Sequence, residues 1–274
     1  MLLLSAPFET TAAERPRPLA TAVIQLGAAA IAVIGIGLTI GRLLPGAGVV
    51  GDAIAGAGVH GGLIGLGWLI ATEATPGWMG PVARIAGAVL VVLIASHLGP
   101  WGVLASMLPP AVLWWEARRR AGLRMLGVCG TRLSYALAGL TAGAFLGGHL
   151  LMTAALTFGY HVQTGGVRGY LGAVTYDVGA NVLSAEWLFR GVLFSLLWRR
   201  FAFWPAAALS TALAVVRYLM DPALPHSADA RAGAIFYLGA LGLVACGLRA
   251  WSGSLLPGYF AALAFFVAYR TLAP

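Results

Sequence analysis

Long apolar runs separated by short polar segments dominate this chain. Counting about 20 apolar residues for each membrane-spanning helix, with shorter helices accepted inside a bundle, the pattern predicts nine spans. The chain is therefore predicted to be all-α, a polytopic transmembrane helix bundle forming a single domain over residues 19–271, after a short cytoplasmic arm, residues 1–18. The expected spans cover residues 19–44, 52–71, 82–98, 101–117, 131–157, 176–198, 202–219, 231–249 and 253–270.

The segment H-L-G-P-W-G, residues 97–102, leaves the number of spans open. Its Gly-Pro step either forms a tight turn between two spans or breaks one long tilted helix, which would reduce the number to eight. Nine spans place the arm, residues 116–124, Arg199–Arg200 and Arg249 on one side of the membrane, as the positive-inside rule requires. Eight spans would separate the arm from the later clusters, so we predict nine spans with the N-terminus inside.

Composition supports a membrane protein. Of 274 residues, 60% are hydrophobic and 9% are charged, whereas soluble domains carry about 25% charged residues. The net charge is +8, but the arginines stand singly or at the ends of apolar runs, so topology accounts for them and no nucleic acid is expected as a partner. Residues 1–18 lack the apolar core and cleavage site of a signal peptide, which favours multi-pass insertion in the inner (cytoplasmic) membrane of a cell.

Glycine is abundant, with 38 residues, and many are four residues apart within the expected spans. Small residues at this interval let helices approach closely in lipid. They either pack the bundle itself or form faces that receive other integral membrane proteins, lipid or a flat pigment. The pairs and triplets are Gly37/Gly41, Gly58/Gly62, Gly61/Gly65 and Gly139/Gly143/Gly147.

Ionisable and histidine side chains at membrane depth are costly, so each is a candidate functional residue. Three acids, Asp52, Asp177 and Asp221, fall at predicted helix ends, where we interpret them as solvated caps. The other candidates are His60, His149, Glu186, Arg190 and Arg217.

His60 and His149 each lie within an expected span beside glycines. Either ring could ligate a metal or a tetrapyrrole, or simply hydrogen-bond to a neighbouring helix. Neither has a second ligand three or four residues away. We therefore predict no metal and no cofactor, and keep both as weak candidates for cofactor binding.

The stretch A-E-W-L-F-R-G-V-L-F, residues 185–194, places Glu186 and Arg190 in the middle of an apolar run. An acid four residues before a base on a helix allows the two side chains to meet, and such a pair costs less in a low dielectric than either charge alone. By itself, this pair indicates a structural clamp.

The same stretch resembles the E-E-x-x-x-R signature, often written with F-R-G, of the CPBP family of intramembrane proteases. That family includes the type II CAAX prenyl endopeptidases and the bacteriocin-processing proteins. Glu186 and Arg190 take the positions of its second glutamate and its arginine, and S-L-L-P, residues 254–257, resembles the entry to its last helix. The resemblance covers roughly the last hundred residues and implies a CPBP-like core over 176–270.

Other residues that the resemblance assigns to the family's active site are replaced here. The first glutamate falls on Ala185 and the histidine of an F-x-x-x-H motif falls on Arg217, while the later histidine and asparagine fall on about Ala262 and Phe266. In the family, the first glutamate and a histidine are thought to activate water, and the later pair to support the oxyanion. None of these four side chains is present, so the resemblance implies a degenerate site.

Elementary chemistry leads to the same expectation. A general base must accept a proton near neutral pH, which Arg217 does not do, and neither Ala185 nor Ala262 titrates. At about 1.5 Å of rise per residue, Glu186, Arg217 and Ala262 lie at similar depths. We predict that Arg217 reaches Glu186, so that a buried Arg/Glu/Arg cluster replaces the water-activating site and no catalytic residue remains.

The sequence thus favours a non-catalytic, CPBP-like membrane protein that acts as a binding partner or accessory subunit of a membrane protein complex. The main alternative is an active, Glu-dependent intramembrane endopeptidase that uses Glu186. A third class, a transport or pigment-binding protein, rests on the glycines and the two histidines.

Overall fold

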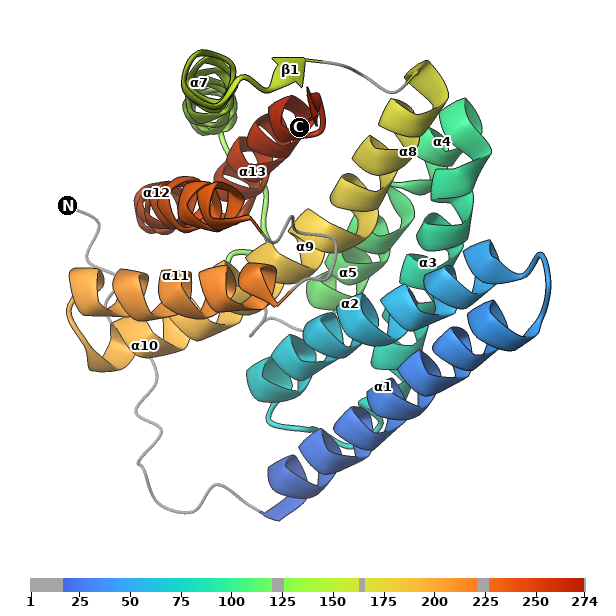
Figure 1. Ribbon diagram of the computed structural model, residues 1–274. Coiled ribbons are helices and arrows are strands. Elements are labelled where there is room, and N and C mark those ends of the chain that lie inside the picture. The colour runs from blue at the N-terminus through green and yellow to red at the C-terminus, as the bar shows by residue number, and fades with distance from the viewer. Residues whose placement is uncertain (1–16, 120–125, 163–165, 221–226, 274) are drawn as a thin grey trace.

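A computed structural model describes residues 17–119, 126–162, 166–220 and 227–273 (Figure 1). The predicted arm, apart from its last two residues, lies outside these ranges. So does Asp221.

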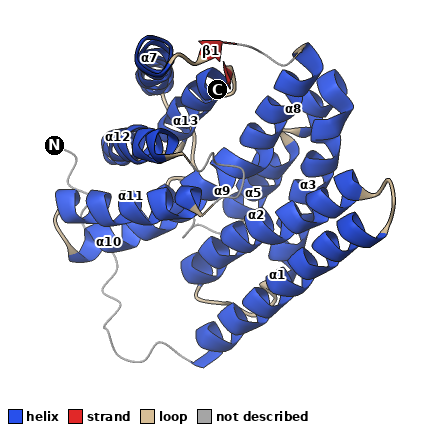
Figure 2. Cartoon of the chain, in the orientation of Figure 1, coloured by secondary structure: helices blue, strands red, loops and turns tan. Residues whose placement is uncertain are grey.

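Helices make up nearly all of the described chain, which confirms the all-α prediction (Figure 2). Within it, the strands are the two-residue elements β1 (His161–Val162) and β2 (Leu272–Ala273), which pair antiparallel. The α-helices are α1 (Arg17–Leu43), α2 (Gly48–Thr72), α3 (Met79–Ala95), α4 (Gly102–Ala105), α5 (Leu108–Arg118), α7 (Leu133–Phe158), α8 (Val167–Tyr176), α9 (Val182–Ala185), α10 (Phe194–Arg200), α11 (Phe203–Leu219), α12 (Ala228–Ser252) and α13 (Leu256–Tyr269); η1 (Ser96–Trp101) is a 3₁₀-helix, and η2 (Asp177–Asn181) and η3 (Glu186–Leu193) are π-helical.

Six helices in the described ranges are long and apolar enough to cross a membrane, and two shorter apolar helices, α11 and α13, accompany them. The protein is therefore an integral membrane protein with a polytopic helical fold. The number of spans and the side of the N-terminus stay predictions. The six long helices are Leu19–Leu43, Gly48–Thr72, Met79–Ala105, Leu133–Phe158, Val167–Arg200 and Ala228–Ser252.

The Gly-Pro segment begins a reversal of the chain. Gly99 has φ 68° and ψ −129°, a backbone conformation that favours glycine. Beyond it, the expected span 101–117 consists of two pieces, α4 and α5. Arg84 lies near the start of α3, and Glu116 lies near the end of α5. Arg84 Nε donates to Glu116 Oε1 at 2.7 Å, so α5 runs back along α3.

One long helix, Val167–Arg200, passes through the middle of the bundle (Figure 1). It comprises α8, η2, α9, η3 and α10, and we call it the central helix. The expected span 176–198 began too late, because the polar Arg168 and two glycines in V-R-G-Y-L-G weaken the apolar pattern there. The interpretation of Asp177 as a solvated cap was therefore wrong: it lies inside the helix and is 2% exposed.

Hydrogen bonds between side chains and backbone carbonyls join the central helix to α2, α11 and α13. Trp187 Nε1 donates to the Ile64 carbonyl of α2 at 3.0 Å. In the other direction, Ser210 Oγ of α11 donates to the Phe189 carbonyl at 2.7 Å, and a tyrosine of α13 donates to a carbonyl of η2. Both of these acceptors lie in π-helical segments, which are frequent at functional sites.

Glycines of the four-residue pattern pack helices of this chain against one another. A Cβ on Gly139 or Gly143 of α7 would overlap the carbonyl of Pro257 or Ala261 of α13, so these helices touch through their backbones. Such close approach is how small residues stabilise helix pairs in lipid.

A matched pair of substitutions on α7 tests this packing. Gly143→Ala should lower the free energy of unfolding by about 1–3 kcal/mol, because the methyl group forces α13 away. Gly148→Ala lies on the same helix, with nothing within 4 Å of the added Cβ, and should be neutral or up to about 1 kcal/mol stabilising. The measurement is unfolding of both variants in the same mild detergent, and equal stabilities would contradict the assignment.

Candidate functional site

Glu186 and Arg190 form an ion pair inside the bundle. Arg190 Nη1 lies 3.4 Å from Glu186 Oε1, and their side chains are 4% and 5% exposed, respectively. Glycines provide the space for both groups: Gly258 of α13 faces Glu186 Oε2, and Gly242 of α12 faces Arg190 Nη2. The local i, i+4 contact that the sequence indicated is therefore formed.

Four of the residues that the family resemblance assigned come together here. Glu186, Arg190, Ala262 and Phe266 line a space of about 10 Å³, which we call the Glu186 cavity; Tyr218 also lines it. A cavity of roughly 10–15 Å³ accommodates about one water molecule. A substrate backbone does not fit in it together with an attacking water.

The other two assigned residues lie elsewhere. Ala185 is 2% exposed and packs in a cluster with Leu188, Phe189 and Ala214. Ala214 also lines the Glu186 cavity, but Ala185 does not. Arg217 Nη1 donates to Asn181 Oδ1 at 2.9 Å, whereas the sequence predicted a contact with Glu186. The two arginines therefore lie on different acceptors and do not share Glu186 as a common partner in the described contacts.

A polar network that the sequence did not reveal surrounds Asp177. Arg270, just beyond α13, donates to both of its oxygens, from Nε to Oδ2 and from Nη2 to Oδ1, each at 2.8 Å. Asn181 Nδ2 donates to Asp177 Oδ1 at 2.9 Å, and Arg217 in turn donates to Asn181. We call Asp177, Asn181, Arg217 and Arg270 the Asp177 network. It ties α11 and the end of α13 to the central helix.

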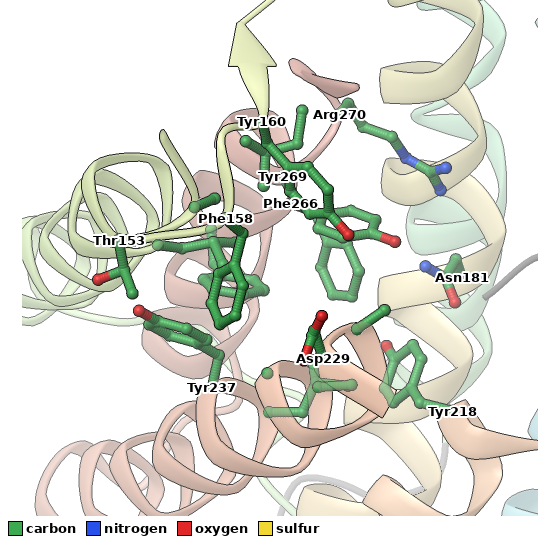
Figure 3. Close-up of a pocket in the computed structure, with 18 of the residues that line it drawn as sticks. Thr153, Phe158, Tyr160, Asn181, Tyr218, Asp229, Tyr237, Phe266, Tyr269 and Arg270 are labelled. Atoms are coloured by element: carbon green, nitrogen blue, oxygen red, sulfur yellow. The ribbon is translucent and has the colours of Figure 1, made fainter. Parts of the chain in front are cut away.

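A much larger cavity, about 430 Å³, lies beside the Glu186 cavity (Figure 3). Residues of α7, α11, α12, α13 and the central helix line it, and it is partly open to the surface; we call it the aromatic cavity. Tyr218, Leu238 and Phe266 line both spaces, so the large cavity adjoins the Glu186 cavity. Asn181 and Arg270 of the Asp177 network also reach its wall.

The two candidate histidines make hydrogen bonds within the bundle. His60 is 3% exposed, with Nδ1 3.0 Å from Ser184 Oγ and Nε2 2.9 Å from Tyr176 Oη, so both ring nitrogens have hydroxyl partners. His149 Nδ1 lies 2.9 Å from Tyr237 Oη. Among the described residues, no three His, Cys, Asp or Glu side chains are grouped to hold a metal ion.

The fold and these cavities define a polytopic membrane protein with a buried polar site between helices of its C-terminal half. Residues 167–265 match the family model of type II CAAX prenyl endopeptidase Rce1-like proteins, so the chain carries an Rce1-like domain of the CPBP family there. The matched segment contains Glu186 and Arg190 and most of the lining of both cavities. No curated protein and no solved structure matches the chain.

Proposed function

We propose that this protein is a non-catalytic, Rce1-like membrane protein that serves as a binding partner or accessory subunit of another membrane protein in the inner membrane of a cell. The observation that carries this proposal is the Glu186 cavity. Its single carboxylate is paired with Arg190, and the space beside it is about 10 Å³.

Hydrolysis of a peptide bond needs a base that is free to take a proton from water, and donors placed where the oxyanion develops. Glu186 Oε1 lies against Arg190. At the positions expected to support the oxyanion, Ala262 and Phe266 contribute neither a hydrogen-bond donor nor a titrating group. Among the described residues that line this cavity, Glu186 is the one with a carboxylate, so no second carboxylate replaces the missing glutamate.

Helix α1 offers the surface that best suits a partner. In the apolar part of α1 only 6% of the residues are buried, and the helix packs mainly on α2. A Cβ added at Gly27 or Gly35 would meet nothing within 4 Å, and the large side chains of Ile24, Ile31 and Leu38 are exposed. Small residues among apolar ones are typical of helix interfaces in lipid, so we propose that a partner helix packs on this face.

Purification from native membranes tests this function. The protein is expected to co-purify in fixed stoichiometry with another integral membrane protein, and Gly35→Phe on α1 is expected to reduce that recovery at least tenfold. Gly148→Phe serves as the matched control, because it adds the same side chain at another open glycine, on α7. Recovery of the wild-type chain without a stoichiometric partner would contradict the proposal.

One observation favours the second candidate, an active endopeptidase. Glu186 lines the Glu186 cavity. Its Oε2 atom is buried and has no hydrogen-bond partner in the described part of the chain. A single water held by this oxygen would be the remnant of a hydrolytic site. A cleavage assay that compares the wild type with Glu186→Gln in reconstituted vesicles separates the two candidates.

A further inference from the structure

We propose that the aromatic cavity binds an organic cation, an alkylammonium group attached to an apolar body. This inference goes beyond the proposed function, because a partner or accessory subunit does not require a small ligand. It rests on the lining of the cavity, on its charge and on its size.

Aromatic rings form a continuous wall around much of the cavity. Tyr237 contacts Phe265 with ring centroids 6.2 Å apart, Phe265 contacts Phe266 at 5.6 Å, and Phe266 contacts Tyr218 at 5.6 Å and Tyr269 at 6.0 Å. Faces of aromatic rings attract cations, and cages of such rings are a recurrent way of binding quaternary ammonium groups.

The aromatic wall continues on the α7 side of the cavity. Phe158 and Tyr160 contact each other with centroids 6.4 Å apart, and both line the cavity. Aromatic rings from α7, α11, α12 and α13 therefore line the space, as Figure 3 shows. Several rings are arranged around one volume, which suits a compact cation better than a flat or extended polar group.

The charged groups that line the cavity are Asp229 and Arg270. Arg270 is neutralised by its two hydrogen bonds to Asp177. The Asp229 carboxylate projects into the cavity in Figure 3, and none of the described residues forms an ion pair or a side-chain hydrogen bond with it. Asp229 lies in the first turn of α12 and is exposed, so its negative charge is accessible to a cationic ligand that enters the cavity.

The size and polarity of the cavity indicate the size and the apolar character of the rest of the ligand. A volume of about 430 Å³ falls within the range of roughly 300–1,000 Å³ found for small-molecule sites. Apolar side chains such as Leu150, Ala234 and Leu238 complete the lining, so the ammonium group should carry an apolar body. Both a free organic cation and the choline headgroup of a lipid have this chemistry.

Equilibrium dialysis of benzyltrimethylammonium against the full-length protein in phosphatidylglycerol nanodiscs tests the proposal, with empty nanodiscs as the background. Binding above background is expected for the wild type. It should weaken at least tenfold in Asp229→Asn and persist in Asp229→Glu, which keeps the charge. Phe266→Leu should weaken binding several-fold, because it keeps an apolar side chain but removes a ring from the wall.

Asp52→Asn is the matched control, since it neutralises an exposed acid on α2 that does not line the cavity, and it should leave binding unchanged. The anion 3-phenylpropionate should not bind. Adding phosphatidylcholine to the nanodiscs separates the sources: competition identifies a lipid headgroup, and its absence identifies a soluble cation. Binding that is unaffected by Asp229→Asn, or equal binding of 3-phenylpropionate, would overturn the proposal, as would failure of benzyltrimethylammonium to bind above background.

Discussion

Arg270→Met should lower the free energy of unfolding by about 3–5 kcal/mol. The substitution leaves the Asp177 carboxylate, 2% exposed, without its bidentate partner inside the bundle. Removing one member of a buried pair costs this much because the remaining charge is uncompensated. Unfolding in mild detergent, followed by a probe of helix content, measures the loss.

Two further variants show whether this loss comes from the ion pair. Arg231→Met removes an exposed arginine from α12 and should change stability by no more than about 0.5 kcal/mol. Asp177→Leu combined with Arg270→Met should recover most of the loss, because apolar replacements of both partners leave no buried charge. A double variant as unstable as Arg270→Met alone would mean that Arg270 contributes through packing, and that the Asp177 network is not the link described above.

Arg190→Met should have an effect of the same size, about 3–5 kcal/mol, because Glu186 would remain buried without its cation. Adding Glu186→Gln to this variant should recover at least half of the loss, since the uncompensated charge is then removed. The interaction energy of the pair follows from a double-mutant cycle of the wild type, the two single variants and the double variant.

This cycle also bears on function. If Arg190→Met were as stable as the wild type, Glu186 would not depend on the arginine for compensation. Its carboxyl group would then be neutral or hydrated, and available to exchange a proton with water. That result would favour the endopeptidase over the non-catalytic protein.

The local part of the site could be predicted from the sequence. The contact between Glu186 and Arg190 depends on helix geometry alone, because residues four apart lie on the same face. The resemblance of F-R-G and S-L-L-P to the CPBP family points to a segment that largely coincides with residues 167–265, which the family model matches. In both cases the information lies within a few adjacent residues.

The long-range part could not be predicted. Asp177 and Arg270 are 93 residues apart, and their contact depends on the tilt and rotation of α13 against the central helix. The depth of Arg217 in the membrane was not enough to predict its hydrogen-bond acceptor. Asn181 and Glu186 are five positions apart on the same helix, and the long arginine side chain can reach either of them. Apolar periodicity fixes which residues are helical, but not how the helices are turned toward one another.

The aromatic cavity could not be predicted for the same reason. Its rings come from α7, α11, α12 and α13, and no segment of the sequence contains enough of them to suggest a cage. Taken singly in the sequence, Tyr237 and Phe265 would be expected to be core or interface residues. Only their convergence around Asp229 suggests a ligand.

We propose that the Rce1-like domain does not hydrolyse peptide bonds, and a cleavage assay in reconstituted vesicles can decide this. The wild-type protein and Glu186→Gln are each incubated with a prenylated CAAX-type peptide and with membrane proteins of the native cell, and new peptide termini are identified by mass spectrometry. An active type II CAAX prenyl endopeptidase serves as the positive control. The same termini are expected with the wild type, with Glu186→Gln and with empty vesicles, whereas termini that appear with the wild type and disappear with Glu186→Gln would show that the domain is an active endopeptidase.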